Sequence, residues 1–270
     1  MPDGWVERYL RLLQVDEEAP SLAALARLTR SQLLHVPFEN ITSLLRYRDQ
    51  GSGVLLPLEP EQMLDRWERR AGGGVCYEVV STFERLLHAL GYQVWSVAGQ
   101  ISFPGSHQAL VIALGSQQYL VDAGNGAPFF EPIPSDKTSE VHHAGLAYRF
   151  RPDDGALLQE RLIAENWTPF CRYVLTPQQP AAFDAAYRRH HLPRESFVIG
   201  PPVVIRCTLD AVHALRGDEL THFSMGGKQV EQITDVDAYQ QVAGDVFGLP
   251  ALPIREALTF LRTLDGAIAA

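Results

Sequence analysis

The stretch GGGVCYEVVSTFERLLHALGY, residues 72–92, decides how the first part of the chain folds. Three glycines open it, and glycine is a strong stop signal for a preceding helix. Apolar residues then recur at intervals of three and four, which is the period of an amphipathic helix. Gly91 suits the position just after a helix C-terminus. The stretch therefore predicts a loop followed by a helix that begins near Cys76. Its apolar stripe comprises Val79, Val80, Phe83, Leu86, Leu87 and Leu90.

Cys76 stands at or just before the N-terminus of this helix. Unpaired backbone N–H groups and the helix dipole favour negative charge there, and so favour a thiolate, the nucleophilic form of cysteine. The glycines before it let the backbone bend sharply and let a substrate come close. A free cysteine is also a common small core residue. The stretch alone leaves both alternatives open, a nucleophile and a packing residue.

Three helices are predicted before this stretch. The segments WVERYLRLL, SLAALARLTRSQLLHVPF and LEPEQMLDRWERRAGGG carry apolar residues at helical intervals; they cover residues 5–13, 21–38 and 58–74. Ser21 is suited to cap the N-terminus of the second helix, and Pro37 ends it. The first ninety residues therefore form a helical region.

From about residue 93 the apolar period changes to two, which indicates β-strands. The strand-like runs cover residues 93–103, 107–115, 118–124, 146–152 and 156–163. A loop and helix at 177–197, further strands at 201–226 and terminal helices at 235–250 and 254–266 complete the pattern. Helices followed by strands and a mixed tail predict an α+β chain with three lobes.

The composition excludes several classes of function. The chain has 270 residues and a net charge of −9, which disfavours sequence-independent binding to nucleic acid or to an anionic membrane. Its three cysteines, Cys76, Cys171 and Cys207, are widely spaced and show neither a disulfide framework nor a zinc spacing. No apolar signal-peptide core or membrane-span length is visible. We therefore expect a cytoplasmic protein without a metal site.

A histidine and an aspartate are placed to activate a thiol. His107 opens the run at 107–115, and Asp122 closes the facing run. A tight turn at residues 115–117 brings them within about two residues of cross-strand register, which their side chains can bridge. An imidazole between a thiol and a carboxylate is the arrangement that nucleophilic catalysis requires. Taken singly, His107 also fits a strand end and Asp122 a turn.

Other candidate features are weaker. The glycines of DAGNGAP, Gly124 and Gly126, leave a loop free to form an N–H nest for a phosphate or an oxyanion. The histidine pairs at 142–143 and 190–191 have no companions at metal-ligand spacing, so we interpret both as solvated loop or helix surface. Cys171 and Cys207 lie in apolar strand-like contexts and are predicted to be core residues.

At these residues the chain resembles the arylamine N-acetyltransferases over almost its whole length. HVPFENI at 35–41, GGVCYE around Cys76, HQALVI at 107–112 and YLVDAGNG at 119–126 are similar to that family's motifs, in the same order. The segments LPRESFVIGPPVVIR and DVFGLPAL resemble two weaker marks downstream. Three separated motifs in order make the resemblance specific.

The resemblance implies a fold and a reaction. The fold has a helical lobe at 1–92, a β-barrel lobe at 93–197 and an α/β lid at 198–270, around a papain-like or transglutaminase-like cysteine core. Acetyl-coenzyme A is the co-substrate, and the acyl group passes through a cysteine to an arylamine or hydrazine nitrogen by a ping-pong route. The implied residues are Cys76 as nucleophile, His107 as base and Asp122 as its orienting partner.

The resemblance also implies binding residues. Phe38 falls where the family has an aromatic residue lining the acceptor pocket, and Gly124 and Gly126 fall in the loop facing the coenzyme A nucleotide. Asn125 stands where many members carry phenylalanine, which predicts a more polar acceptor pocket. Two further departures are Gly72, where the family usually has arginine, and Val80, where it commonly has asparagine.

Three rival functions remain. The first is a related amide synthase that releases or cyclises a polyketide-type chain held on an acyl carrier protein. The second is a hydrolase or transglutaminase-type enzyme that uses the same three residues, and the third is a catalytically silent binding scaffold. The first is the main alternative.

Overall fold

The structure, a computed structural model, describes residues 4–51 and 55–269. Five helices form the first part of the chain: α1 (Trp5–Leu13), α2 (Leu22–His35), α3 (Ile41–Gln50), α4 (Pro60–Glu68) and α5 (Cys76–Ala89). The predicted cap of the second helix is confirmed, because the Ala24 N–H donates to Ser21 Oγ at 3.1 Å. Helix α3 was not predicted.

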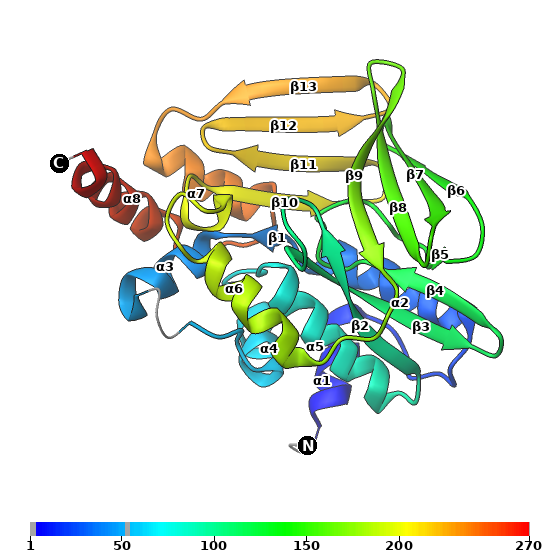
Figure 1. The fold of residues 1–270 in the computed structure, drawn as a ribbon. Coiled ribbons are helices and arrows are strands. Elements are labelled where there is room, and N and C mark those ends of the chain that lie inside the picture. The colour runs from blue at the N-terminus through cyan, green and yellow to red at the C-terminus, as the bar shows by residue number, and fades with distance from the viewer. Residues whose placement is uncertain (1–3, 52–54, 270) are drawn as a thin grey trace.

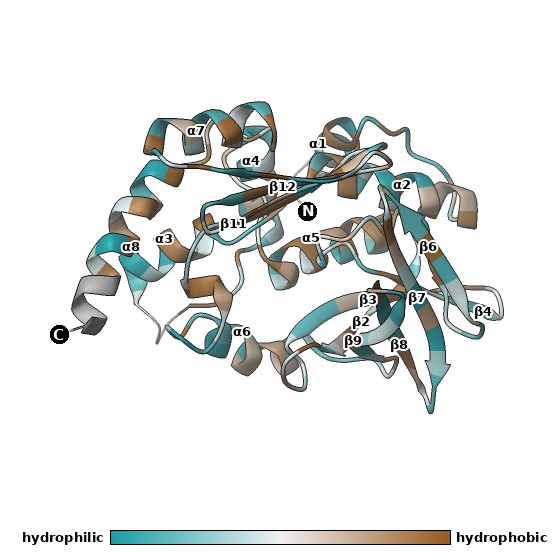
Figure 2. Ribbon diagram, turned by 90° about the horizontal axis from the view of Figure 1, so that it is seen from above, coloured by the Kyte–Doolittle hydropathy of each residue, from teal (hydrophilic) through white to brown (hydrophobic). Residues whose placement is uncertain are grey.

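Helix α5 is the centre of the molecule. Its apolar side packs on α1, α2 and α4 and against the sheet strands β2 (Gln93–Gln100) and β3 (His107–Leu114). Viewed from above, α5 lies between the two sheets of the protein (Figure 2). Residues at its N-terminus, Cys76 and Tyr77, instead join the core cluster shared with the C-terminal helices. The N-terminus of α5 therefore lies where the lobes meet.

The larger sheet has eight strands in the order β5-β4-β3-β2-β9-β8-β7-β6 and curves into a nearly closed barrel (Figure 1). Its remaining strands are β4 (Gln117–Val121), β5 (Ile133–Pro134), β6 (Ser139–His143), β7 (Leu146–Asp153), β8 (Ala156–Ile163) and β9 (Asn166–Val174). The sequence predicted five of these strands and missed β5, β6 and β9. The interpretation of residues 142–143 as loop or helix was wrong, because both histidines belong to β6, with His142 exposed and His143 half-buried.

The smaller sheet combines two distant parts of the sequence. Its order is β1-β10-β11-β12-β13, formed by β1 (Phe38–Glu39), β10 (Val203–Cys207), β11 (Ala211–Arg216), β12 (Glu219–Ser224) and β13 (Gly227–Gln232). Strand β1 comes from the helical region and pairs with β10 through Phe38 and Ile205. The first lobe therefore supplies the edge of the third-lobe sheet, which fixes Phe38 beside the centre of the molecule.

Short helices and the C-terminal helices complete the fold. The 3₁₀ turn η1 (Pro180–Phe183) leads into α6 (Asp184–His190), and η2 (Phe197–Ile199) leads into β10. Helices α7 (Val236–Asp245) and α8 (Ile254–Ala269) lie beside the smaller sheet (Figure 1). Within residues 4–51 and 55–269, no helix is both long enough and apolar enough to cross a bilayer.

Candidate active site

Cys76 is the first residue of α5, as the sequence predicted. The amide N–H groups of a first helical turn have no intrahelical acceptor, so they point at whatever lies before the helix. The loop after β4 packs directly on this turn: a Cβ added to Gly124 would lie 2.7 Å from the Cys76 Cα. Gly124 is required because any side chain there would displace the Cys76 backbone.

The glycines before Cys76 serve the packing of the chain itself. A Cβ added to Gly73 would lie 1.6 Å from the carbonyl oxygen of Pro37, so the two backbones touch. The prediction for these glycines was a sharp bend and close approach of a substrate. At Gly73 the approaching group is instead the segment that leads into β1.

The three cysteines are all buried, with exposed fractions of 7% for Cys76, 1% for Cys171 and 3% for Cys207. Burial alone therefore does not separate a nucleophile from a packing residue. The surroundings do: Cys76 lines a cavity, whereas Cys171 lies in β9 within the barrel core and Cys207 in β10 within the smaller sheet. The prediction that Cys171 and Cys207 are core residues is confirmed.

His107 lies between Cys76 and Asp122. Leu110 pairs with Val121 across the β3–β4 hairpin, so Asp122 lies two residues out of register with His107, as predicted. The His107 Nε2 atom is 2.8 Å from Asp122 Oδ2. The imidazole lies near enough to Cys76 for the two groups to interact electrostatically, and both residues line the same cavity. Because Nε2 is engaged by Asp122, Nδ1 is the ring nitrogen left for the thiol.

The electrostatics favour a charged imidazole. Burial by itself lowers the pKa of His107, but the negative charges of Asp122 and Cys76 outweigh burial and hold that pKa well above its ordinary value. A histidine of this kind carries its proton at neutral pH. The site thus stabilises an imidazolium beside the Asp122 carboxylate.

Asp122 is fixed by donors from three directions. It accepts hydrogen bonds from the Tyr173 hydroxyl at 2.6 Å, the Asn125 amide at 3.1 Å and the Gly124 N–H at 3.1 Å, besides His107. Burial raises the pKa of Asp122, but the charge of His107 and these bonds more than offset it, and the pKa lies below its usual value. The sequence did not reveal Tyr173, which comes from the unpredicted strand β9.

These contacts revise two interpretations. The Gly124 N–H donates to Asp122, so it is not part of a free N–H nest for a phosphate. The Asn125 side chain lines the cavity, yet its amide nitrogen points at Asp122 and at Tyr173, whose hydroxyl oxygen lies 3.2 Å away. Asn125 thus supports the carboxylate, a role that was not predicted. Gly126 lies against Ile205 and Phe38.

A cavity of about 460 Å³ opens beside Cys76 and His107. Aromatic side chains from four elements line it: Phe38 of β1, Tyr77 of α5, Phe170 of β9 and Phe197 of η2. The Phe38 and Phe197 rings lie 6.0 Å apart. A cavity of this size and character fits a small aromatic molecule. Phe38, which the resemblance assigns to the acceptor pocket, lines this cavity.

His190 is a cavity residue that the sequence analysis placed wrongly on the surface. It is 7% exposed and packs on Tyr77 of α5, while His191 is fully buried beside the Tyr187 ring of α6. His190 Nε2 lies 2.9 Å from the Ser106 carbonyl oxygen, and Nδ1 lies 2.7 Å from Ser196 Oγ. Burial lowers the pKa of His190 to about 4. A neutral His190 thus holds the carbonyl group of Ser106, the residue before His107, by a hydrogen bond.

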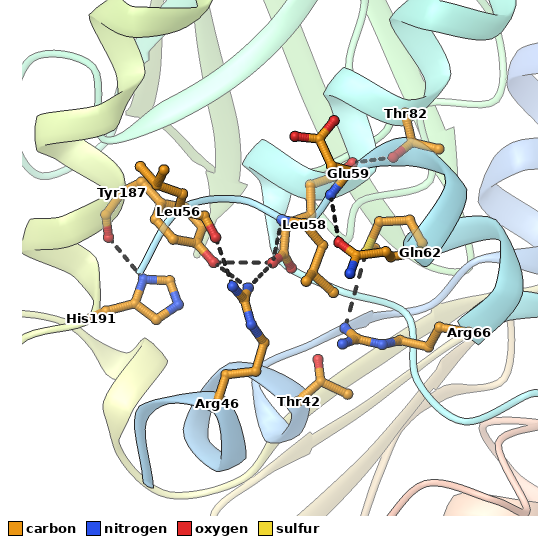
Figure 3. Close-up of polar contacts among 12 residues, drawn as sticks. Thr42, Arg46, Leu56, Leu58, Glu59, Gln62, Arg66, Thr82, Tyr187 and His191 are labelled. Atoms are coloured by element: carbon orange, nitrogen blue, oxygen red, sulfur yellow. Dashed lines mark hydrogen bonds and ion pairs between the residues drawn. The ribbon is translucent and has the colours of Figure 1, made fainter. Parts of the chain in front are cut away.

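Gly72, where the resemblance leads one to expect arginine, packs closely against Thr42, Glu39 and Arg66 of α4. A Cβ added to Gly72 would lie 3.2 Å from Arg66 Cδ and 3.1 Å from Glu39 Oε1. Burial raises the pKa of Glu39, and the charge of Arg66 is the largest effect that opposes it. Figure 3 shows Thr42 on α3 and Arg66 on α4. Arg66 thus gives the buried Glu39 a nearby positive charge.

A second buried ion pair holds the first turn of α5. Arg46 Nη1 donates to Glu78 at 2.7 Å and to the Tyr187 hydroxyl at 2.8 Å, while Nη2 donates to the Leu56 carbonyl oxygen. Figure 3 shows Arg46 reaching from α3 toward Tyr187 and Leu56. Breaking a buried pair leaves an uncompensated charge, which typically costs about 3–5 kcal/mol. Three segments are thereby tied to the turn that carries Cys76.

Comparisons with known proteins agree with this arrangement. A family model described as N-acetyltransferase matches residues 21–253. An arylamine N-acetyltransferase / N-hydroxyarylamine O-acetyltransferase of Salmonella typhimurium is 25% identical over 268 residues, which cover 89% of this chain and 86% of that protein. Proansamycin X synthase of Amycolatopsis mediterranei is 25% identical over 183 residues, 64% of this chain and 69% of that protein.

The fold agrees as well. The solved structure of Mycobacterium marinum arylamine N-acetyltransferase in complex with CoA superposes with a TM-score of 0.81 at 22% identity, covering 94% of this chain and 96% of that one. The predicted fold class, with its helical first part, β-barrel and papain-like cysteine core, is confirmed.

Proposed function

The chain belongs to the arylamine N-acetyltransferase family, an enzyme family, and we propose that it moves an acetyl group from acetyl-coenzyme A through Cys76 to the nitrogen of an arylamine or hydrazine. Acetyl-coenzyme A is a co-substrate rather than a resident cofactor, and the structure in complex with CoA of the M. marinum relative supports that choice.

The observation that carries the proposal is the placement of one imidazole. His107 bonds Asp122 through Nε2 and interacts electrostatically with Cys76, with which it lines a cavity that also has aromatic rings in its wall. A thiol needs a base within reach, and the base needs a partner that fixes its tautomer. The cavity supplies space for the second substrate next to both.

In the first step the Cys76 thiolate attacks the thioester carbonyl carbon. A new carbon–sulfur bond forms, and N–H groups at the start of α5 stabilise the oxyanion. The bond to the coenzyme A sulfur then breaks, and the leaving thiolate takes the proton of the His107 imidazolium. The products are free coenzyme A, an acetyl-cysteine and a neutral His107.

In the second step an amine attacks the acetyl-cysteine. Neutral His107 accepts the proton that the amine nitrogen loses, and the Cys76 thiolate leaves. The resting thiolate–imidazolium pair is restored, so neither step consumes a proton overall. Asp122 holds the ring in place and stabilises its positive charge in the resting state.

The remaining assignments of the site belong to this proposal. Phe38 and the other aromatic rings are assigned to the acceptor. Gly126 is assigned to the loop that faces the donor nucleotide, while Gly124 packs on Cys76 as described. The three lobes at 1–92, 93–197 and 198–270 are the proposed units, with β1 shared between the first and third. A cytoplasmic location is part of the proposal.

The second candidate is an amide synthase whose donor is an acyl chain on a carrier protein. The observation that favours it is the similarity to proansamycin X synthase. The two candidates share Cys76, His107 and Asp122 and differ in the donor: coenzyme A carries a nucleotide, whereas a carrier protein presents a pantetheine arm only. We favour coenzyme A because the full-length arylamine N-acetyltransferase similarity covers more of the chain.

A donor comparison tests the choice. The protein is mixed with acetyl-coenzyme A or with a longer acyl chain on pantetheine, and its intact mass is measured before and after an arylamine is added. We expect one acetyl group per chain from acetyl-coenzyme A, lost to the amine. If only the pantetheine thioester acylates the protein, the acetyltransferase proposal is wrong and the amide synthase is the better assignment. Release of free acetate at the same rate with and without amine would indicate a hydrolase.

A further inference from the structure

Two arginines line the cavity that holds Cys76. Arg161 belongs to β8 of the barrel, and Arg216 ends β11 of the smaller sheet. The two lobes thus each contribute one guanidinium group to the same space. Arg161 is half-buried and Arg216 is exposed.

Neither arginine has a carboxylate partner among residues 4–51 and 55–269. Other arginines of this acidic chain do: Arg149 and Arg151 pair with Glu160, and Arg172 pairs with Asp153. Glu160 precedes Arg161 in the strand and therefore points to the opposite face of the sheet. The Nε atom of Arg161 is buried without a hydrogen-bond partner. A buried N–H donor of a charged group is costly when it has no acceptor. An anion bound in the cavity would supply the acceptor that Arg161 Nε lacks.

Aromatic contact holds Arg161 in place. Its guanidinium carbon lies 3.2 Å from the centre of the Phe170 ring. A guanidinium over a ring face keeps its N–H edge free, and that planar edge matches a carboxylate or phosphate. Burial lowers the pKa of Arg161, and the charge of Arg216 adds to this effect. An anion between the two groups would offset the cost of burying the Arg161 charge and the repulsion between the two cations.

We propose that Arg161 and Arg216 form an anion subsite for a carboxylate on the acceptor, so that the preferred acceptors are aromatic amines that carry a carboxylate group. The proposal rests on the proposed function, since it names the subclass of its second substrate. The amine would face Cys76, the ring would lie among Phe38, Phe170 and Phe197, and the carboxylate would meet the two guanidinium groups.

The phosphates of coenzyme A fit this subsite less well. A long pantetheine arm separates them from the thioester, which must reach Cys76. The arginines lie in the same 460 Å³ cavity as Cys76. This volume holds a substituted aromatic ring, but it has no room for a nucleotide in addition. Size therefore favours the carboxylate of a small acceptor.

The test compares 4-aminobenzoate with 4-aminobenzamide, which is neutral and has the same ring and a carbonyl in the same place. The ratio of their kcat/KM values is measured for the wild type, Arg161→Gln, Arg216→Gln and, as a control, Arg172→Gln on the same sheet but outside the cavity. Thermal unfolding checks that each variant is folded. We expect the wild type to favour the anion, and each cavity variant to reduce the ratio by about ten- to a hundred-fold. Arg172→Gln should leave the ratio unchanged, and Arg161→Lys should retain part of it.

An unchanged ratio in both cavity variants overturns the subsite. The subsite is also overturned if the ratio stays constant while the variants slow acetylation of Cys76 by acetyl-coenzyme A but not by 4-nitrophenyl acetate. The arginines would then bind the phosphate groups of the donor. Failure of the proposed function looks different, because the wild type would form no acetyl-cysteine. In that case calorimetric binding of 4-aminobenzoate and 4-aminobenzamide still decides: tighter binding of the anion that depends on both arginines supports the subsite, and equal binding overturns it.

Discussion

The Nε2 atom of His107 and the Oδ2 atom of Asp122 lie 2.8 Å apart across the mouth of the β3–β4 hairpin. The bond fixes which ring nitrogen faces Cys76. It also joins a histidine whose pKa is raised to a carboxylate whose pKa is lowered, so both groups are charged at neutral pH. The account of the site depends on this bond and on the donors around the carboxylate.

Asp122→Asn should abolish most acylation. Tyr173, Asn125 and Gly124 all donate toward this side chain, so an amide NH₂ group would face other donors, and an asparagine cannot replace the carboxylate as it does in some cysteine proteases. We expect the burst of 4-nitrophenol from 4-nitrophenyl acetate to slow by at least ~100-fold. A folded variant, checked by circular dichroism, that acylates within a few-fold of the wild type would refute this reading of the bond.

Tyr173→Phe should act through Asp122 rather than on the substrate. The hydroxyl donates to Oδ2 at 2.6 Å and is fully buried, so its loss raises the pKa of Asp122 and destabilises the fold by about 1–3 kcal/mol. We expect the acidic limb of the kcat/KM profile to move to higher pH. Tyr239→Phe, whose hydroxyl bonds the distant Gly217 carbonyl, is the matched control and should not move that limb. A purely structural role for Tyr173 would lower stability without shifting the pH profile.

Asn125→Phe separates two roles of residue 125. If it only lined the acceptor pocket, phenylalanine would improve aromatic over aliphatic amines. Because its amide donates to Asp122, we expect acylation itself to slow, by roughly ten-fold, before any amine is present. Single-turnover acetylation measures this step. If the acylation rate is unaffected but the preference for aromatic over aliphatic amines changes, residue 125 acts by lining the acceptor pocket.

The charged His107 gives stability a defined pH dependence. Its pKa in the folded state is raised, so the stability it contributes is complete below about pH 6.5, its ordinary value, and is lost as the pH rises through the raised value. The opposite holds for Asp122, whose contribution exists above about pH 3.9 and is lost as the pH falls through its lowered value. Urea unfolding of the wild type and His107→Gln between pH 6 and 10 tests the first statement. The stability difference should shrink with rising pH, and a growing difference would contradict it.

Local sequence patterns predicted the helix and the two strands that hold Cys76, His107 and Asp122. The apolar period of α5 predicted that Cys76 begins a helix. The alternation of two short runs predicted a hairpin in which His107 and Asp122 are about two positions out of cross-strand register. These arrangements follow from neighbours in the sequence. Tyr173 and His190 do not: each reaches the site from an element distant in sequence, β9 and α6, whose position depends on tertiary packing. The same is true of Arg66, which brings a positive charge near the buried Glu39 from a neighbouring helix.

The weak strands were missed for a related reason. Strands β5 and β6 are short or largely polar, and β9 contains Pro169 within a mostly exposed start, so their sequences lack a clear alternation. They become strands because a neighbour pairs with them. Strand β1 is only two residues long and exists because β10 lies beside it.

Peptide mapping after exposure to acetyl-coenzyme A tests the central claim most directly. The wild type, Cys76→Ala, Cys171→Ala and Cys207→Ala are each incubated with the donor, and the modified peptide is identified by mass spectrometry. We predict one acetyl group on Cys76 in the wild type and in the other two cysteine variants, none in Cys76→Ala, and loss of the group with formation of the N-acetyl product when an arylamine is added. Acetylation that persists in Cys76→Ala, together with normal amide formation, would contradict the account.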